Sequence, residues 1–308
     1  MDNITIVTAF FDIGREDWQK WTRNNHQYIN NFKFWARIKN KMVIYTETKF
    51  KKEILDIRKL YGLENRTTLI VIDDIYSCDK NIYTKIKDVM SSNIFKSFRK
   101  HPQNPESWNA KYNYITYLKS FFVTNAIENN LVTDFAAWID FGFGYNGKGD
   151  YPYSEEFNFL WQYNFKNKMY LFLIDEIGIN KPIFDIIKNM DTYIAGNAVI
   201  GPKSLWPIYH KLCRRAVISL TDCGFADDDQ TIALMAYKSN PNIFELYKIS
   251  SWWGWLKELG GNHLTIRHYK KKKHKEYKKA SILAYKEKQY KQALIFYLKY
   301  IMEKIKGK

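Results

Sequence analysis

The segment from Trp138 to Gly142, Trp-Ile-Asp-Phe-Gly, places a carboxylate and a glycine directly after an apolar run. If that run is a strand of a parallel sheet, ligands bind beyond its carboxyl end. Asp140 can there hold a hard divalent cation that in turn holds a diphosphate, and Gly142 lets a ligand approach the backbone. An aspartate that only caps the following turn is an equal alternative. A protein kinase metal motif is rejected, because neither a glycine-rich loop nor a His-Arg-Asp loop accompanies Asp-Phe-Gly.

An acidic cluster, Asp227-Asp228-Asp229, is followed by Gln230 and opens a helical pattern. Clustered carboxylates repel one another, which raises the pKa of at least one of them. A raised pKa suits a general base, and the carboxylates could also bind a cation or sugar hydroxyls. The competing interpretation is an N-terminal cap favoured by the helix dipole, and on residue types alone capping is the commoner use. Gln230 beside the acids fits sugar recognition better than capping.

Polar residues also end the first apolar run, at the turn that leads from Asp12 to Arg15. The first strand of a nucleotide-binding sheet ends near the base and ribose. Phe10 could stack on a base, Asp12 could accept a hydrogen bond from ribose or base, and Arg15 could bind phosphate. Neither the dinucleotide fingerprint nor a Walker-type loop occurs in the sequence.

Near the end of the main part of the chain, Trp252, Trp253 and Trp255 form an aromatic cluster. Aromatic rings beside polar groups stack on sugar rings, so the three tryptophans are candidate acceptor-binding residues. The Gly-Gly-Asn-His segment that follows could place His263 on a metal or a phosphate. Hydrophobic packing is the alternative for each tryptophan.

These residues need a sheet and helices to position them. Apolar, β-branched runs predict strands at residues 4–11, 42–46, 68–72, 135–142, 169–174, 192–200 and 244–247. Helical patterns run through about 18–29, 49–61, 112–129, 203–220 and 228–239. The alternation of strands and helices predicts an α/β fold in which a mostly parallel sheet has helices on both faces.

Composition excludes several other classes of protein. The chain has 308 residues, 17% of them aromatic, with 14 Gly, 7 Pro and 3 Cys, which excludes disordered, collagen-like and disulfide-scaffold proteins. Neither a membrane span nor a secretory signal is found, so we expect a cytoplasmic protein.

The positive charge of the chain is concentrated at its C-terminal end. Of the net charge of +16, residues 270–308 carry +11 through 14 lysines and three glutamates. We therefore expect a catalytic domain at 1–269 and a basic helical tail, a helix pair, at 270–308.

Taken together, the motifs resemble the HtrL/YibB family of bacterial proteins. The resemblance rests on residues 5–15, 114–119, 138–142 and 228–231 and covers about residues 3–265. Members of that family look like GT-A-type glycosyltransferases that bind a nucleotide sugar in a Rossmann-like domain. The resemblance implies a divalent cation, Mn²⁺ or Mg²⁺, as cofactor. It also implies a donor-binding set, comprising Thr8, Phe10, Asp12, Arg15, Tyr45, Lys119, Asp140 and Gly142.

The resemblance further implies individual roles. Asp140 would be the last residue of the Asp-x-Asp motif that binds metal and diphosphate, although Trp138 stands at the first position. His263 would be a further metal or phosphate ligand, and Lys119 would face the donor. Asp229 would be the catalytic base of an inverting transfer, with Asp228 as the fallback.

The function expected from these features is glycosyl transfer. A hexose or N-acetylhexosamine would pass from a nucleotide donor, UDP by class, to a hydroxyl of a lipid-linked surface glycan such as lipooligosaccharide, O-antigen or capsule. The basic tail would hold the enzyme on the anionic inner membrane, as a peripheral protein. Nucleic acid is not an expected partner, and oligomers remain open. The alternatives are a non-catalytic protein whose tail binds nucleic acid or an anionic membrane, and a scaffold.

Overall fold

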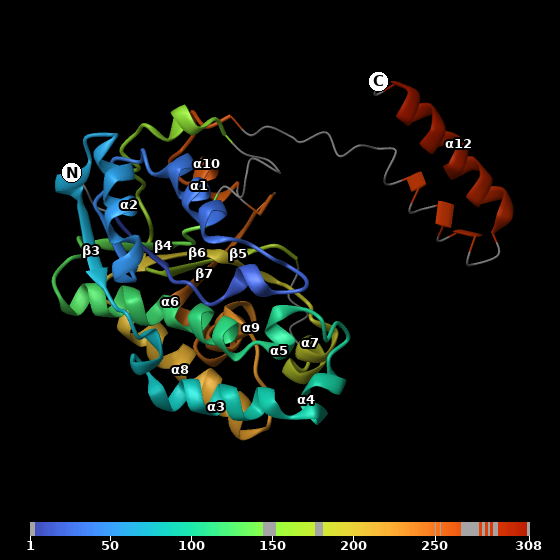
Figure 1. Cartoon of the computed structure of the whole chain (residues 1–308), viewed down its shortest axis with the longest axis horizontal. Coiled ribbons are helices and arrows are strands. Elements are labelled where there is room, and N and C mark those ends of the chain that lie inside the picture. The colour runs from blue at the N-terminus through green and yellow to red at the C-terminus, as the bar shows by residue number, and fades with distance from the viewer. Residues whose placement is uncertain are drawn as a thin grey trace. The chain divides into compact units, whose positions relative to one another are not determined.

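One sheet organises the part of the chain that the computed structural model describes, namely residues 4–143, 152–175, 181–249, 251–252, 254–265, 277–278, 281–282, 284–285 and 289–306. Its strand order is β3-β2-β1-β4-β6-β5-β7 (Figure 1). The bounds are β1 Ile4–Phe10, β2 Met42–Thr46, β3 Thr67–Val71, β4 Phe135–Ile139, β5 Met169–Leu173, β6 Ile194–Pro202 and β7 Phe244–Lys248. β6 runs antiparallel to β4 and β5, and the other pairs are parallel.

Helices cover both faces of this sheet (Figure 1). One face packs against α6 Ala110–Glu128, α8 Trp206–Asp222 and α9 Asp229–Ser239, with α3 Lys80–Ser91 outside α6 and α8. α1 Asn25–Trp35, α2 Thr48–Lys59 and α10 Trp255–Glu258 lie on the other face. The remaining helices include α4 Asn93–Phe98, α5 Pro105–Trp108 and α7 Ile183–Asn189. Because both faces are covered, β2 and β6 are buried along their whole length and their sequences do not alternate.

The α/β architecture expected from the sequence, a mixed and mostly parallel sheet between helices, is therefore confirmed. One helix differs from its predicted range. The helix expected through residues 18–29 begins only at Asn25, because the Asn24 side chain accepts a hydrogen bond from the Gln27 amide at 2.9 Å and caps the helix there. Trp21 lies outside it, with a positive φ of 63°.

The strand order creates a crevice between β1 and β4. From β1 the chain crosses to β2 and β3 on one side, and then returns to place β4 on the other side of β1. Connections that leave neighbouring parallel strands in opposite directions open a crevice at the carboxyl ends of those strands. The turns after Phe10 and after Ile139 both enter this crevice, because β1 and β4 are parallel.

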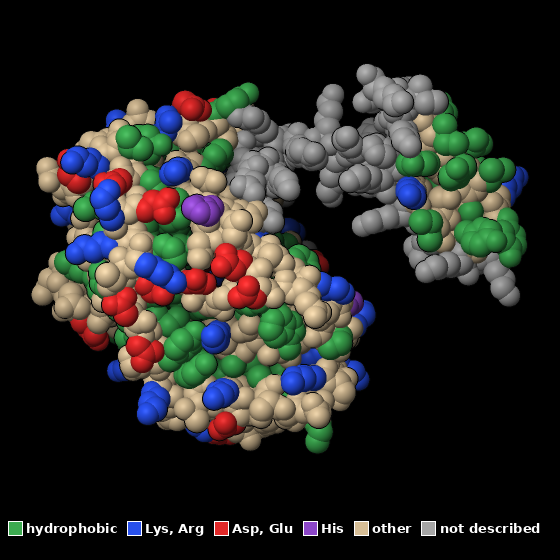
Figure 2. All heavy atoms as spheres, in the orientation of Figure 1, with side chains coloured by type: hydrophobic (Ala, Val, Ile, Leu, Met, Phe, Trp, Pro, Cys, Tyr) green, Lys and Arg blue, Asp and Glu red, His purple; other side chains and the backbone are tan. Residues whose placement is uncertain are grey.

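A second compact unit comprises Lys148–Tyr151 and Ile266–Lys308. Its principal described helix is α12, Tyr290–Lys306. Apolar side chains of α12 lie open to solvent (Figure 2), and they include Tyr290, Leu294, Tyr297, Leu298, Ile301 and Met302. Among the described residues, no helix combines the length and apolar content that a membrane span requires.

A buried arginine ties the loop between α1 and β2 to α2. The Arg58 guanidinium donates to the carbonyl oxygens of Ala36 and Ile38 at 2.8 and 2.7 Å, and to that of Asn40 at 3.1 Å. Its side chain is fully buried, and burial lowers its pKa to about 9. The arginine therefore satisfies three carbonyl groups that would otherwise be buried without a donor.

We expect Arg58→Ala to lower the free energy of unfolding by about 3 kcal/mol or more, because each buried carbonyl left without a donor costs about 1–3 kcal/mol. Urea denaturation followed by circular dichroism measures this change. Lys59→Ala, one residue along the same helix and exposed, is the matched control and should change stability little. Equal stability of the two variants would contradict this account of Arg58.

Candidate active site

A cavity of about 410 Å³ occupies the crevice at the carboxyl ends of β1 and β4. It brings together segments that are far apart in the sequence. Its lining includes Phe10, Asp12, Arg15, Asn25, Tyr28, Tyr112, Thr116, Lys119, Trp138, Asp140, Gly142, Gly196, Asn197, Asp228, Asp229, Gln230 and Trp252. The three polar motifs that the sequence analysis singled out, at residues 10–15, 140–142 and 228–230, thus share one cavity.

The Lys119 ammonium lies between two carboxylates in this cavity. Its Nζ is 2.9 Å from Asp140 Oδ1 and 2.8 Å from Asp229 Oδ2. It also donates to the carbonyl oxygen of Gly196 at 2.6 Å. Burial alone would lower the pKa of Lys119, but the charges of Asp140 and Asp229 outweigh burial and raise it. Lys119 is therefore a fixed positive charge at neutral pH.

Helix α6 aims Lys119 at the cavity. The Asn109 side chain caps this helix by accepting from the Tyr112 amide at 3.1 Å. Tyr112, Thr116 and Lys119 recur at the i, i+4, i+7 spacing that puts side chains on one helix face, and all three line the cavity. The face of α6 that carries Lys119 is therefore the one turned toward the crevice.

Asp140 follows β4 and is held by hydrogen bonds. Its backbone amide donates to the Asn197 carbonyl at 2.9 Å, which extends the pairing of β4 with β6. Its Oδ1 accepts the Trp138 indole N–H at 2.8 Å in addition to the Lys119 ammonium. Trp138, at the first position of the Asp-x-Asp pattern, is thus a donor to Asp140.

Asp229 is the first residue of α9 and reaches toward β6. A Cβ atom on Gly196 would lie 2.5 Å from Asp229 Oδ2, so only glycine at position 196 allows this approach. Burial raises the pKa of Asp229 to about 6, the charge of Asp140 adds to the rise, and Lys119 opposes it. A carboxyl group with a pKa near neutrality is suited to general base catalysis at pH 7.

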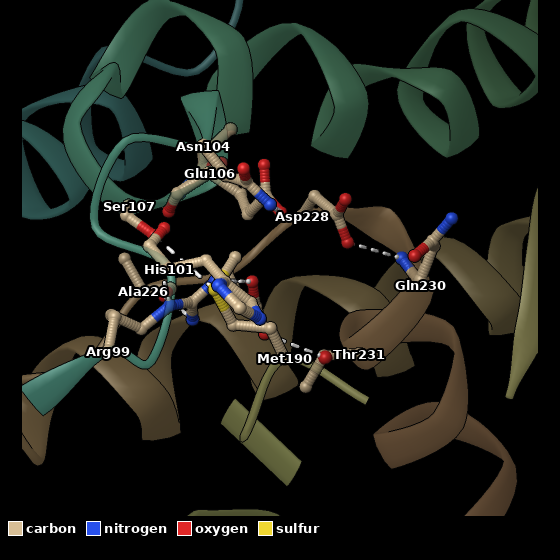
Figure 3. Close-up of polar contacts among 12 residues, drawn as sticks. Arg99, His101, Asn104, Glu106, Ser107, Met190, Ala226, Asp228, Gln230 and Thr231 are labelled. Atoms are coloured by element: carbon tan, nitrogen blue, oxygen red, sulfur yellow. Dashed lines mark hydrogen bonds and ion pairs between the residues drawn. The ribbon is translucent and has the colours of Figure 1, made fainter. Parts of the chain in front are cut away.

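The other two aspartates of the cluster have different partners, and those of Asp228 can be followed in Figure 3. Asp227 is buried and pairs with Arg99 Nη2 at 2.9 Å. Asp228 caps α9, since its Oδ1 accepts from the Gln230 amide at 3.1 Å. Burial raises the pKa of Asp228 well above its usual value, and the charges of Asp229, Asp227 and Glu106 raise it further. The structure thus confirms capping for Asp228, whereas the Asp229 carboxylate lies beside Lys119 in the cavity.

The turn after β1 adds a carboxylate and a guanidinium to the cavity lining. Asp12 accepts from the Gly14 amide at 2.9 Å, from Asn25 Nδ2 at 3.0 Å and from Lys49 Nζ at 2.9 Å. Burial raises the pKa of Asp12, but these hydrogen bonds lower it below its ordinary value. Arg15 donates to the Tyr28 hydroxyl oxygen. Both side chains are held in place while lining the cavity.

Two expected donor-binding residues have mainly packing roles in the structure. Thr8 and Tyr45 are fully buried and are not among the residues that line the cavity. The Tyr45 hydroxyl donates to Asn125 Oδ1 at 2.8 Å on α6. Phe10 does line the cavity, but its ring is 4% exposed and stacks on Phe141 at a centroid distance of 4.8 Å. Little of the Phe10 ring face is open to a base.

Trp252 and Trp255, two of the three tryptophans expected to bind the acceptor, do not share one location in the structure. Trp252 lines the cavity, and its carbonyl oxygen accepts from Asn197 Nδ2 at 2.9 Å. Trp255 is fully buried and stacks on Phe172 at 5.2 Å. Trp253 lies outside the described residues. His263 lies away from the cavity lining, with its Nε2 3.0 Å from the Glu156 carbonyl oxygen and its ring against Phe159.

The residues present do not fit the divalent cation that the resemblance implies. The described residues contain no group of three His, Cys, Asp or Glu side chains placed to hold a metal, so a cation here would depend on at most two carboxylates and on ligands from outside the chain. Asp140 already accepts from an indole and an ammonium. Asn197 Oδ1 is buried without a hydrogen-bond partner, but it is a single neutral oxygen. The position between the two carboxylates is taken by Lys119.

Sequence reasoning did not single out several cavity residues, among them Asn25, Tyr28, Tyr112, Gly196 and Asn197. Two of them carry a signal in the sequence. Tyr112 shares its helix face with Lys119, and Gly196 interrupts an otherwise buried apolar strand, which marks a close approach by another group. Asn25 and Tyr28 depend on the start of α1, which the predicted helix misplaced.

Comparison with known proteins identifies the family. Residues 2–258 match the family model described as "Bacterial protein of unknown function (HtrL_YibB)". The chain is 31% identical over 257 residues to protein HtrL of Escherichia coli (strain K12), covering 79% of this chain and 86% of that protein. This chain therefore belongs to the HtrL/YibB family. Among solved structures, mouse xyloside xylosyltransferase 1 in its apo form aligns with a TM-score of 0.39 and 11% identity, over 81% of this chain and 88% of that one.

Replacing Asp228 with asparagine is expected to stabilise the protein at neutral pH. The Asp228 pKa is raised on folding, so the stability of the parent protein falls as pH rises above the ordinary value of 3.8. Asparagine keeps the cap without needing a proton. Thermal unfolding should therefore show a gain for Asp228→Asn that is small at pH 4 and grows toward pH 7.

The alanine variant at this position serves as the control. Asp228→Ala also removes the carboxyl group, but it loses the cap, which is worth about 1 kcal/mol. It should therefore be less stable than Asp228→Asn at every pH. A gain in stability for Asp228→Asn that does not change with pH would show that folding does not raise the pKa of the Asp228 carboxyl group.

Proposed function

We propose that this member of the HtrL/YibB family is a glycosyltransferase that moves a sugar from a nucleotide donor to a hydroxyl group of an acceptor. The observation that carries the proposal is the cavity at the carboxyl ends of β1 and β4, where Asp229, with a pKa of about 6, lies beside the fixed charge of Lys119. A crevice of this kind is the usual ligand site of an open α/β sheet. Asp229 could accept the proton of the acceptor hydroxyl, and Lys119 could stabilise the leaving diphosphate.

The two ends of the cavity suit the two parts of a nucleotide donor. Asp12 and Asn25, joined by a 3.0 Å hydrogen bond, offer polar groups to a ribose or base at the end of β1. Arg15 lines the same cavity and offers guanidinium N–H groups for a phosphate. Lys119 adds positive charge further along the cavity, beside Asp140. The diphosphate would lie between Arg15 and Lys119.

In the proposed transfer step, one bond forms, one bond breaks and one proton moves. The acceptor oxygen forms a bond to the anomeric carbon, and the bond from that carbon to the diphosphate oxygen breaks with its electron pair on the leaving group. The acceptor proton passes to Asp229. Positive charge at Lys119 and Arg15 stabilises the negative charge that develops on the leaving diphosphate. Attack from the face opposite the leaving group inverts the anomeric centre.

The finer assignments extend this proposal. We propose a UDP-linked hexose or N-acetylhexosamine as donor and a lipid-linked surface glycan as acceptor, with the Trp252 side of the cavity receiving the acceptor. The C-terminal unit would bind an anionic membrane, because residues 270–308 carry +11 and α12 exposes apolar side chains. Exposed apolar side chains favour a membrane over nucleic acid, which is bound mainly through charge and base stacking.

Replacing Asp229 with asparagine should reduce transfer about 10²–10⁴-fold, the usual contribution of a general base. Donor affinity should change far less, because asparagine keeps the size and polarity of the side chain. The measurements are nucleotide release from a panel of sugar nucleotides and calorimetric titration with nucleoside diphosphates. A large loss of donor affinity with little change in the transfer step would instead make Asp229 a binding residue. An absence of nucleotide release across the panel would remove the glycosyltransferase proposal itself.

The pH dependence of transfer should follow the ionisation of Asp229. A base must be deprotonated to act, and burial sets the pKa of Asp229 at about 6. The rate should therefore fall as pH decreases through about 6 and level off above about 7. Lys119→Met removes the charge that opposes this rise, so the acidic limb should move to higher pH. An unchanged limb in Lys119→Met would contradict the coupling of the two groups.

Deleting residues 270–308 should release the protein from anionic vesicles while sparing hydrolysis of the donor. Each lysine near an anionic surface contributes about 1 kcal/mol, so several together give firm binding. Co-sedimentation with vesicles that contain phosphatidylglycerol, compared with neutral phosphatidylcholine vesicles, measures the effect. Equal vesicle binding by the full and shortened proteins would show that the tail is not the membrane contact.

A further inference from the structure

We infer that Lys119 is the resident cation of this site and that the site operates without a divalent metal ion at Asp140. The ammonium occupies the place between Asp140 and Asp229 that a bridging divalent ion would need. This inference rests on the proposed function for its chemical meaning. Its first test, metal binding, is independent of turnover.

Three oxygen atoms from three separate elements surround the ammonium. Asp140 Oδ1 follows β4, the Gly196 carbonyl belongs to β6, and Asp229 Oδ2 begins α9. An ammonium group has three N–H donors and no acceptor, so these three oxygens account for all of its donors. The Lys119 side chain is only 14% exposed. The protein has thus built a complete coordination shell for its own cation.

The charges around this position also favour the Lys119 ammonium over a divalent ion. Two carboxylates that face one another without a cation repel, and burial increases that repulsion. The Lys119 ammonium neutralises one of the two negative charges and bonds directly to both groups. A divalent ion that entered between them would have to expel the ammonium from its three oxygens. Leaving a buried charge without its partners costs several kcal/mol.

The indole of Trp138 also disfavours a metal site at Asp140, because it takes up one of the two carboxylate oxygens. In the Asp-x-Asp pattern, the first residue supplies a carboxylate. Here the Trp138 side chain is 3% exposed and donates its N–H to Asp140 Oδ1 at 2.8 Å. The same oxygen accepts from Lys119. An oxygen that faces two donors presents positive, not negative, surroundings to an approaching metal ion.

Gly196 shows that the arrangement depends on close contact. Its carbonyl oxygen lies 2.6 Å from Lys119 Nζ, and a Cβ at this position would meet Asp229 Oδ2 at 2.5 Å. Gly196 of β6 therefore has two effects. Its carbonyl oxygen accepts from Lys119, and its missing side chain leaves space for the Asp229 carboxylate. The shell is therefore assembled by the backbone as well as by side chains.

Titration with Mn²⁺, followed by the electron paramagnetic resonance signal of the free ion, tests the inference on the full-length protein. The parent protein should leave the signal of sub-millimolar Mn²⁺ unchanged. Lys119→Met should bind Mn²⁺ at least about tenfold more tightly, a change of 1.4 kcal/mol, because the vacated carboxylates become available. Adding Asp140→Asn to Lys119→Met should abolish that gain.

A matched lysine elsewhere separates this effect from a general loss of positive charge. Lys85 pairs with Asp222 at 2.7 Å on the surface, away from the cavity lining. Lys85→Met removes the same charge from a lysine–aspartate pair and should not create Mn²⁺ binding. Stoichiometric Mn²⁺ binding by the parent protein that Asp140→Asn removes would overturn the inference. That measurement needs no lysine variant, so it decides the question even if Lys119→Met fails to fold.

Turnover provides the second test. In a donor screen, nucleotide release by the parent protein should proceed in EDTA at a rate within about twofold of that with Mn²⁺, since the proposed cation is part of the chain. A loss of about a hundredfold or more in EDTA that Mn²⁺ restores would overturn the inference. If no sugar nucleotide is turned over in either condition, the glycosyltransferase proposal fails. The Mn²⁺ titration alone then decides the inference.

Discussion

The structure of the site depends on an ammonium group placed between two carboxylates. Lys119 joins the end of β4, the beginning of β6 and the start of α9, and its side chain is largely buried. A buried ion pair of this kind contributes little net stability to a fold, because the loss of hydration of both partners offsets their attraction. Its value is in geometry. The contacts to Lys119 hold together the three elements that carry Asp140, Gly196 and Asp229, and all three residues line the cavity.

Sheet direction supplies the rest of this geometry. β1 and β4 are parallel, so their polar turns open at the same edge, while β6 runs the other way and contributes its own interior backbone at that edge. The chain must then pass through α8 before α9 delivers Asp229. Asp229 and Lys119 consequently come from helices on one face of the sheet, and Asp12, Asn25 and Arg15 come from the turn after β1 and the start of α1. The cavity therefore combines polar side chains from both faces of the sheet.

The sequence predicted the architecture and part of the cavity, for identifiable reasons. Buried apolar runs mark strands reliably when both faces are covered, so the positions after β1 and β4 could be placed at one edge, and with them Asp12 and Asp140. The sequence did not reveal that Thr8 and Tyr45 pack inside, because a strand buried on both faces gives no sign of which residue reaches the edge. His263 meets a backbone carbonyl at Glu156, a partner more than a hundred residues away that no local pattern announces. The division of labour among three adjacent aspartates likewise follows from Arg99 and Lys119, which reach them from other elements.

Gly196 also bears on how such a site can change during evolution. Every substitution at this position adds at least one carbon, and that carbon would overlap the Asp229 carboxylate. A side chain at position 196 would therefore require the Asp229 carboxylate to move or to be replaced, so the residues at these two positions are expected to change together. Relatives with a side chain at position 196 would not keep the close contact between the Asp229 carboxylate and strand β6. A glycine with no functional group of its own thus indicates which divergent sequences can keep this contact.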